Sequence, residues 1–201
     1  MKRLLLPILL GASMIIAVTA ASAEGQKAPA APVMKAGVLS PVMAAPAIKL
    51  QGTDGRPLEL TRYKGKVVLL AFGFSNCGEV CPITLHTLAT ARRKLGSEGD
   101  GVQVVYVTVD PERDTAAQMK KFLGAFDATF VGGVGTRAEI DAAQKSYGIS
   151  SSKTVNPDGS YTIGHSSSIY IIDRAGGLRA VMPYGHPADD FVHDLKILLR
   201  S

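Results

Sequence analysis

The sequence predicts an α/β domain with a central mixed β-sheet flanked by helices, and three observations support this fold class. Hydrophobic residues make up 46% of the chain and charged residues 19%, as in an ordinary folded protein. From residue 48 onward, apolar runs of strand length alternate with stretches of helical periodicity, which indicates a mostly parallel sheet. The last two strand-like runs flank a tight turn, so an antiparallel hairpin makes the sheet mixed.

The first residues, 1–23, are predicted to be a signal peptide or a membrane anchor. Lys2 and Arg3 precede an apolar stretch that runs to Ala20, and Ala21-Ser22-Ala23 forms a small-residue cleavage site. Cleavage would release a soluble mature chain, whereas an uncleaved stretch would tether it to the membrane. With either outcome we expect a periplasmic domain, soluble or anchored to the inner membrane and facing the periplasm.

Residues 24–47 are predicted to be a flexible tether, because they are rich in Ala and Pro and hold few large apolar groups. The folded domain would then cover residues 48–201. Met34 and Met43 offer thioether sulfur to copper, but two methionines in a flexible segment are a weak signal. The net charge of +5 is mild and dispersed, so we expect no nucleic-acid partner.

The first predicted elements of the domain are a β-hairpin and a buried strand. Residues 48–50 and 58–60 alternate in polarity around Thr53-Asp54-Gly55, which is a turn signal. Residues 67–72 form a continuous apolar run, as expected of a central strand that is covered on both faces. The N-terminal hairpin therefore leads into the middle of the sheet.

Helices and strands alternate through the rest of the chain. The first helix begins near Pro82, which suits a first helical turn because it has no N–H to leave unpaired, and it ends at Gly96. Next come a strand over 102–109, a helix over 115–126, a short strand at 130–131 and a helix over 137–147. A hairpin of strands 167–172 and 177–182 and a last helix over 187–199 complete the domain. This is the order of a thioredoxin-like fold.

Cys77 and Cys81, the only cysteines, lie four residues apart directly after the buried strand 67–72. Residues at i and i+4 share one face of a helix, so two thiols with this spacing can close a disulfide or bind one soft metal ion. In open α/β sheets, reactive groups collect at this carboxyl end of the strands. Outside the cytosol the thiols stay reduced only with the help of a partner or a metal.

The positions of the histidines help to distinguish a disulfide from a metal site at these cysteines. His165 lies in the predicted loop before strand 167–172, at the same edge of the sheet, and an imidazole beside two thiolates would complete a three-ligand copper site. His86, His186 and His193 are interpreted as ordinary surface or hydrogen-bonded residues.

The polar cluster Asp110–Thr115 is interpreted as mainly structural. Asp114 or Thr115 is a good helix N-cap, and Arg113 can pair with a neighbouring carboxylate. We therefore place none of this cluster among the candidate ligands.

Three segments together resemble the signatures of the Sco/SenC family, namely Phe72–Pro82, Thr108–Thr115 and His165–Asp173. The resemblance implies a thioredoxin-like domain on the outer face of a membrane that binds Cu(I) or Cu(II) through Cys77, Cys81 and His165. It also implies a metallochaperone that helps to assemble the dinuclear copper centre of cytochrome c oxidase. Its partners would be the copper-accepting subunit of the oxidase and, upstream, another periplasmic copper chaperone or a thiol reductant.

The chain departs from the family pattern at two places beside the proposed ligands. The family usually has Pro-Asp where this chain has Gly78-Glu79, and an aspartate where it has Gly164. Glycine adds backbone freedom to the ligand loop, and the missing aspartate removes an acceptor that could fix the imidazole.

Two enzymatic alternatives remain. In a thiol-disulfide oxidoreductase, Cys77 would attack a disulfide and Cys81 would resolve the mixed disulfide without any metal. The three residues between the cysteines and the presence of His165 weaken this alternative. One protein could still both reduce and load an acceptor, or the thiol pair could act in redox sensing. A peroxiredoxin is disfavoured because Gly78 stands where a threonine is expected.

Overall fold

The computed structural model describes residues 33–201. The predicted signal segment 1–23 and the first part of the predicted tether lie outside the described residues. Within residues 33–201, no helix has both the length and the apolar character that crossing a membrane requires.

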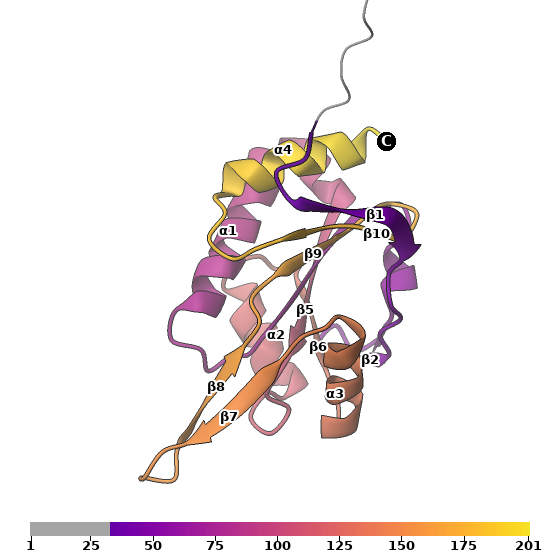
Figure 1. The fold of residues 1–201 in the computed structure, drawn as a ribbon. Coiled ribbons are helices and arrows are strands. Elements are labelled where there is room, and N and C mark those ends of the chain that lie inside the picture. The colour runs from indigo at the N-terminus through magenta and orange to yellow at the C-terminus, as the bar shows by residue number, and fades with distance from the viewer. Residues whose placement is uncertain (1–32) are drawn as a thin grey trace, which may run out of the picture. The chain divides into compact units, whose positions relative to one another are not determined.

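An eight-stranded mixed sheet forms the centre of the domain, in the order β1-β10-β9-β4-β5-β6-β2-β3 (Figure 1). Its strands are β1 (Gly37–Ala44), β2 (Leu50–Gly52), β3 (Pro57–Leu58), β4 (Val67–Gly73), β5 (Val102–Thr108), β6 (Val131–Val134), β9 (Ile169–Ile172) and β10 (Gly177–Met182). Strands β4, β5 and β6 are parallel, and the other neighbours pair antiparallel. The predicted mixed sheet is confirmed, and the architecture is thioredoxin-like.

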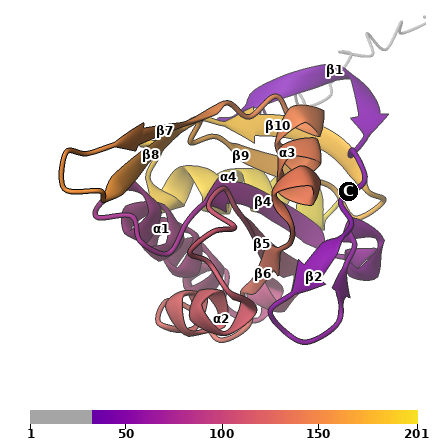
Figure 2. The same ribbon diagram turned by 90° about the horizontal axis from the view of Figure 1, so that it is seen from below.

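Helices cover both faces of this sheet, as predicted. They are α1 (Val80–Lys94), α2 (Ala116–Gly124), α3 (Arg137–Ser146) and α4 (Ala188–Leu199), with the 3-10 helices η1 (Leu60–Tyr63) and η2 (Gly96–Gly101). Figure 2 shows α1, α2 and α4 on one side of the sheet and α3 on the other.

Strands β4 and β5 lie at the centre of the core, and every one of their residues is buried. Helices on both faces exclude water from them, which explains why their sequences are apolar throughout and not alternating. The two strands pair in register from Val67 with Val102 to Gly73 with Thr108, so they end at the same edge. The cysteine loop after β4 and the Asp110 turn after β5 therefore leave the sheet side by side.

Local sequence signals account for the helix ends. Thr115 caps α2 in a capping box with Gln118, and Thr136 caps α3 in the same way with Glu139. Helix α1 ends before Gly96, whose φ of 58° lies in the left-handed region that favours glycine. Of the two predicted caps for α2, Thr115 is correct and Asp114 is not.

The C-terminal part of the predicted tether is folded, so the expected boundary at residue 48 is wrong. Residues 37–44 form β1, which pairs antiparallel with β10 at the edge of the sheet. The backbone N–H groups of Lys35 and Ala36 also donate to the buried carboxylate of Asp194, at 2.7 and 2.8 Å. Main-chain hydrogen bonds hold this segment, and its mostly exposed side chains leave no hydrophobic signal in the sequence.

A second, two-stranded sheet was not predicted. Strands β7 (Ser151–Val155) and β8 (Tyr161–His165) form an antiparallel hairpin that projects from the domain (Figure 1). Their residues are largely polar and exposed or half-buried, so the alternation that marks a strand is weak. His165 is consequently the last residue of β8 and does not lie in a loop.

Candidate metal centre

Cys77 and Cys81 lie where β4 passes into α1. Cys77 precedes the helix, and Cys81 is its second residue. The backbone N–H of Cys81 donates to Sγ of Cys77 at 3.5 Å. Because the first N–H groups of a helix have no partner within it, the Cys77 sulfur supplies an acceptor for one of them. Both cysteines are free thiols, with Cys77 half-buried and Cys81 buried.

The fold brings His165 against Cys81 although the two are far apart in the sequence. Nε2 of His165 lies 3.8 Å from Sγ of Cys81. Bonds of about 2.3 Å to sulfur and about 2.0 Å to nitrogen would span this gap at an angle of roughly 120°. This pair is therefore spaced as two ligands of one ion would be.

In this conformation, Cys77 does not join Cys81 and His165 as a third metal ligand. Its sulfur faces the Cys81 amide. Within residues 33–201, no three side chains of His, Cys, Asp or Glu converge closely enough to hold a metal ion. A three-ligand site requires Cys77 to reorient, and a side chain at the neighbouring Gly78 would meet no atom within 4 Å. Gly78 is exposed, so the loop is open to solvent at this point.

The imidazole of His165 is oriented by the backbone. Its Nδ1 lies 2.7 Å from the carbonyl oxygen of Ser166, so Nδ1 carries the proton and donates it. The lone pair of Nε2 is then directed toward Cys81, which suits a metal ligand. Burial lowers the pKa of His165, with the bond to Ser166 acting in the opposite direction, so the ring is neutral. The Ser166 carbonyl thus supplies the acceptor that an aspartate at Gly164 could have provided.

The environment of Cys81 disfavours a thiolate that has no cation beside it. Burial raises the pKa of the Cys81 thiol to about 12, against smaller lowering effects of Tyr106 and the Phe74 backbone. A bound metal cation displaces the thiol proton and compensates the charge that burial penalises. The position therefore matches a metal ligand better than a free nucleophile.

Asp114 joins the cysteine loop to β5. Its carboxylate accepts hydrogen bonds from the Ser75 backbone N–H at 3.2 Å and from the Thr108 hydroxyl at 2.6 Å. It also accepts one from the Ser75 hydroxyl, and it is 4% exposed. Sequence reasoning treated Asp114 only as a helix cap, because nothing local in the sequence places Ser75 beside it.

The hairpin that carries His165 is fixed to the turn after β5. The Tyr161 hydroxyl donates to buried Asp110 at 2.8 Å, and the Arg113 guanidinium donates to the Tyr161 carbonyl at 3.1 Å. The guanidinium carbon of Arg113 lies 3.8 Å from the centroid of the Tyr161 ring. Arg113 also forms an ion pair with Asp110, which confirms the predicted pairing with a neighbouring carboxylate. The cluster interpreted as structural therefore helps to position β8.

The other histidines and the methionines lie elsewhere. His86 is exposed on α1. His186 pairs with Asp190 at 2.8 Å, and His193 with Asp194 at 2.9 Å. The interpretation of these three as surface or hydrogen-bonded residues is confirmed. Met34 packs against the core and Met43 is exposed on β1.

Comparisons with known proteins agree on one family. The sequence profile described as SCO1/SenC matches residues 44–200. A protein of Stutzerimonas stutzeri, named as copper-binding, is 30% identical over 137 residues, which are 68% of this chain and 67% of that protein. The mitochondrial SCO1 homolog 1 of Arabidopsis thaliana is 36% identical over 121 residues. This match covers 59% of the present chain but only 36% of the length of the Arabidopsis protein.

Solved structures extend the likeness to the fold. Bradyrhizobium japonicum ScoI with copper bound is 33% identical, with a TM-score of 0.72 over 78% of this chain and 100% of that chain. BsSco, in which a disulfide switch was identified, is described as a member of the Sco family of cytochrome c oxidase assembly proteins. It is 26% identical, with a TM-score of 0.62 over 84% of this chain and 98% of that chain.

Proposed function

The chain belongs to the SCO1/SenC family, and on that basis we propose that it is a copper metallochaperone that binds copper through Cys77, Cys81 and His165. Its cargo would be delivered to the dinuclear copper centre of cytochrome c oxidase. The observation that carries the proposal is the approach of Nε2 of His165 to Sγ of Cys81, next to the one other cysteine of the chain.

The donor set fits copper. Thiolates select Cu(I), and an added imidazole also supports Cu(II). Neutral His165 offers Nε2 directly, whereas Cys81 must release its proton to solvent when it takes up the ion. Affinity at this site should therefore increase with pH.

Unequal burial of the two cysteines suggests the order of transfer. Cys81 is 2% exposed and lies against His165, whereas Cys77 is half-buried at the start of the helix. An incoming acceptor thiolate would first replace the Cys77 thiolate as a ligand of the copper ion. Cys81 and His165 would release the ion afterwards. Ligand exchange of this kind moves copper without a free ion in solution.

The partner and the location follow from the same proposal. We infer that the acceptor is the copper-accepting subunit of the oxidase, since a structural relative is described as an oxidase assembly protein. Another periplasmic copper chaperone or a thiol reductant would keep the site loaded or reduced. Residues 1–23 would export the domain to the periplasm, where it is soluble or anchored to the inner membrane.

A transfer experiment tests the chaperone role. The reduced, Cu(I)-loaded protein is mixed with the metal-free, reduced copper-binding domain of the oxidase subunit, and copper on each is measured after separation. We expect copper to move to the acceptor, and protein oxidised to the Cys77–Cys81 disulfide to carry none. Retention of copper by the loaded protein at excess acceptor would contradict the chaperone role.

A second candidate function is thiol-disulfide exchange, which the free, half-buried thiol of Cys77 just before α1 favours. Cys77 thiolate would attack an acceptor disulfide, form a mixed disulfide and release one acceptor thiolate. Cys81 would then attack Cys77, close the Cys77–Cys81 disulfide and release the second acceptor thiol. The raised pKa of Cys81 makes this second step slow, so a reaction with a disulfide peptide should accumulate the mixed disulfide. Rapid complete turnover would favour the oxidoreductase.

A further inference from the structure

Tyr106 places a hydroxyl group beside the candidate ligands that the fold itself does not use. It lies on β5, is 1% exposed and points to the face of the sheet that α2 covers, where its ring packs against Phe122 with centroids 6.4 Å apart. Its buried hydroxyl makes no hydrogen bond of ordinary geometry among the described residues, although it lies close enough to the Cys81 thiol to lower the pKa of that group. Tyrosine hydroxyls usually find a partner when they are buried, so this one requires an explanation.

Gly73 creates the space that the hydroxyl occupies. A β-carbon on Gly73 would lie 1.8 Å from the hydroxyl oxygen of Tyr106 and 3.0 Å from Sγ of Cys81. Any larger residue at the end of β4 would therefore collide with Tyr106. The hydroxyl and the Cys81 sulfur therefore border the same point, and Tyr106 and Cys81 line a small cavity together with His165.

Packing alone does not account for the oxygen atom. A phenylalanine at this position would keep the ring contact with Phe122 and would leave no orphaned polar group. A phenol is protonated at neutral pH and can donate a hydrogen bond, whereas a neutral thiol is a weak acceptor. A thiolate is a much stronger acceptor than a thiol, because hydrogen bonds to ionised groups are shorter and stronger.

We propose that Tyr106 is a positioning residue that donates a hydrogen bond to the Cys81 sulfur when this sulfur is a metal-bound thiolate. The inference rests on the copper site proposed above. When copper binds, the thiol proton of Cys81 leaves to solvent, and the sulfur becomes a much stronger acceptor for the Tyr106 hydroxyl than the neutral thiol is. The bond would strengthen copper binding and lower the energy of the sulfur electrons that interact with the metal.

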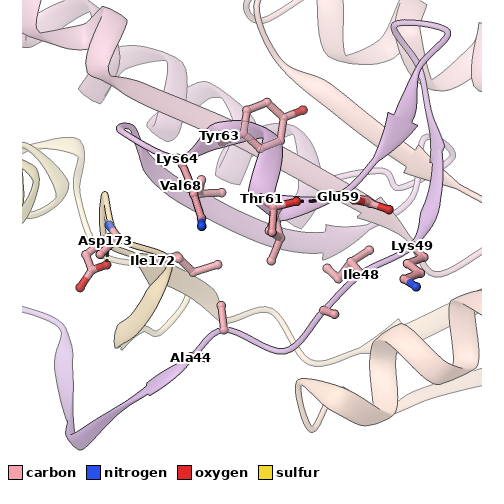
Figure 3. A pocket seen from close by; sticks show the side chains of 15 residues that line it. Ala44, Ile48, Lys49, Glu59, Thr61, Tyr63, Lys64, Val68, Ile172 and Asp173 are labelled. Atoms are coloured by element: carbon pink, nitrogen blue, oxygen red, sulfur yellow. Dashed lines mark hydrogen bonds between the residues drawn. The ribbon is translucent and has the colours of Figure 1, made fainter.

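The test compares Tyr106→Phe with Tyr63→Phe. Tyr63 is a matched control because its hydroxyl is also buried without a partner, yet it lines a different cavity of about 390 Å³ with Ala44, Ile48 and Ile172 (Figure 3). Cu(I) affinity of the reduced proteins is measured by competition with a chelator of known affinity. The sulfur-to-Cu(II) charge-transfer band and the unfolding midpoint of the metal-free proteins are measured beside it.

We expect Tyr106→Phe to weaken Cu(I) binding about tenfold or more and to move the charge-transfer band to longer wavelength. The same variant should unfold no more easily than the wild type when metal-free, because it loses only an unpaired hydroxyl. Tyr63→Phe should leave the affinity and the band unchanged. Unchanged affinity and spectrum in Tyr106→Phe would overturn the inference, provided that the wild type binds copper and Cys81→Ser does not. A wild type without copper affinity would instead overturn the proposed function.

Discussion

Among single residues, Asp114 links the core of the domain to the ligand loop most directly. Asp114→Asn would replace a carboxylate that accepts from Ser75 and Thr108 by an amide with one acceptor oxygen, so the loop before Cys77 should loosen. We expect weaker Cu(I) binding and a loss of about 1–3 kcal/mol in the free energy of unfolding. Competition titration and denaturant unfolding measure the two effects.

The neighbouring residue provides the control for this prediction. Thr115→Ala removes the N-cap of α2 and should reduce the free energy of unfolding by about 1 kcal/mol. It leaves the contacts of Ser75 intact, so Cu(I) affinity should not change. Equal loss of affinity in both variants would mean that Asp114 acts only through global stability.

Residue chemistry made part of the site predictable. Cys77, Cys81 and His165 stood out because thiols and imidazoles are the ligands that copper prefers and because they end or precede predicted strands. Asp114 and Tyr106 did not stand out, because each acts through a contact with a segment far away in the sequence. The orienting acceptor of His165 is a backbone carbonyl, which no residue type can signal.

At the level of elements, the β7–β8 hairpin sets the position of His165. Tyr161→Phe removes the hydroxyl that donates to Asp110 and leaves the stacking of Arg113 on the ring. We expect faster hydrogen exchange of the β8 amides and little change in the exchange of β4 and β5. If exchange in β8 is unchanged, Arg113 alone holds the hairpin in place.

The turn between β2 and β3 makes the free energy of unfolding depend on pH, and this effect does not involve the candidate metal centre. Burial alone would raise the pKa of Asp54, but hydrogen bonds from Arg62 and Arg56 lower it to about 2. Its stabilising contribution is therefore complete above the ordinary value of 3.8 and is lost as the pH falls toward about 2. The free energy of unfolding of Asp54→Asn should fall less steeply than that of the wild type over this interval. Parallel acid-unfolding curves would refute the assignment.

Elements with an apolar face were the predictable ones. The runs that became β4, β5 and α1 bury side chains, so hydrophobic periodicity marks them. Strand β1 and the β7–β8 hairpin are held by main-chain and polar contacts with few buried side chains. Hydrogen-bond partners of that kind are fixed by the tertiary structure, and the local sequence does not report them.

For the whole molecule, the N-terminal boundary of the folded unit is testable. A chain that begins at residue 48 lacks β1 and the two N–H donors to Asp194, whose side chain is fully buried. We expect it to lose at least about 2 kcal/mol in the free energy of unfolding relative to a chain that begins at Val33. Denaturant unfolding of the two chains measures the difference, and equal stability would restore the boundary at residue 48.

A single copper ion shared by Cys77, Cys81 and His165 can be tested by competition titration with Cu(I) under reducing conditions. The wild type is compared with Cys77→Ser, Cys81→Ser and His165→Ala, with His86→Ala as a control on an exposed histidine. We expect one copper per chain in the wild type and in His86→Ala, and weaker binding in each of the three ligand variants. Wild-type affinity retained in Cys77→Ser and Cys81→Ser would show that copper is not bound by these thiols.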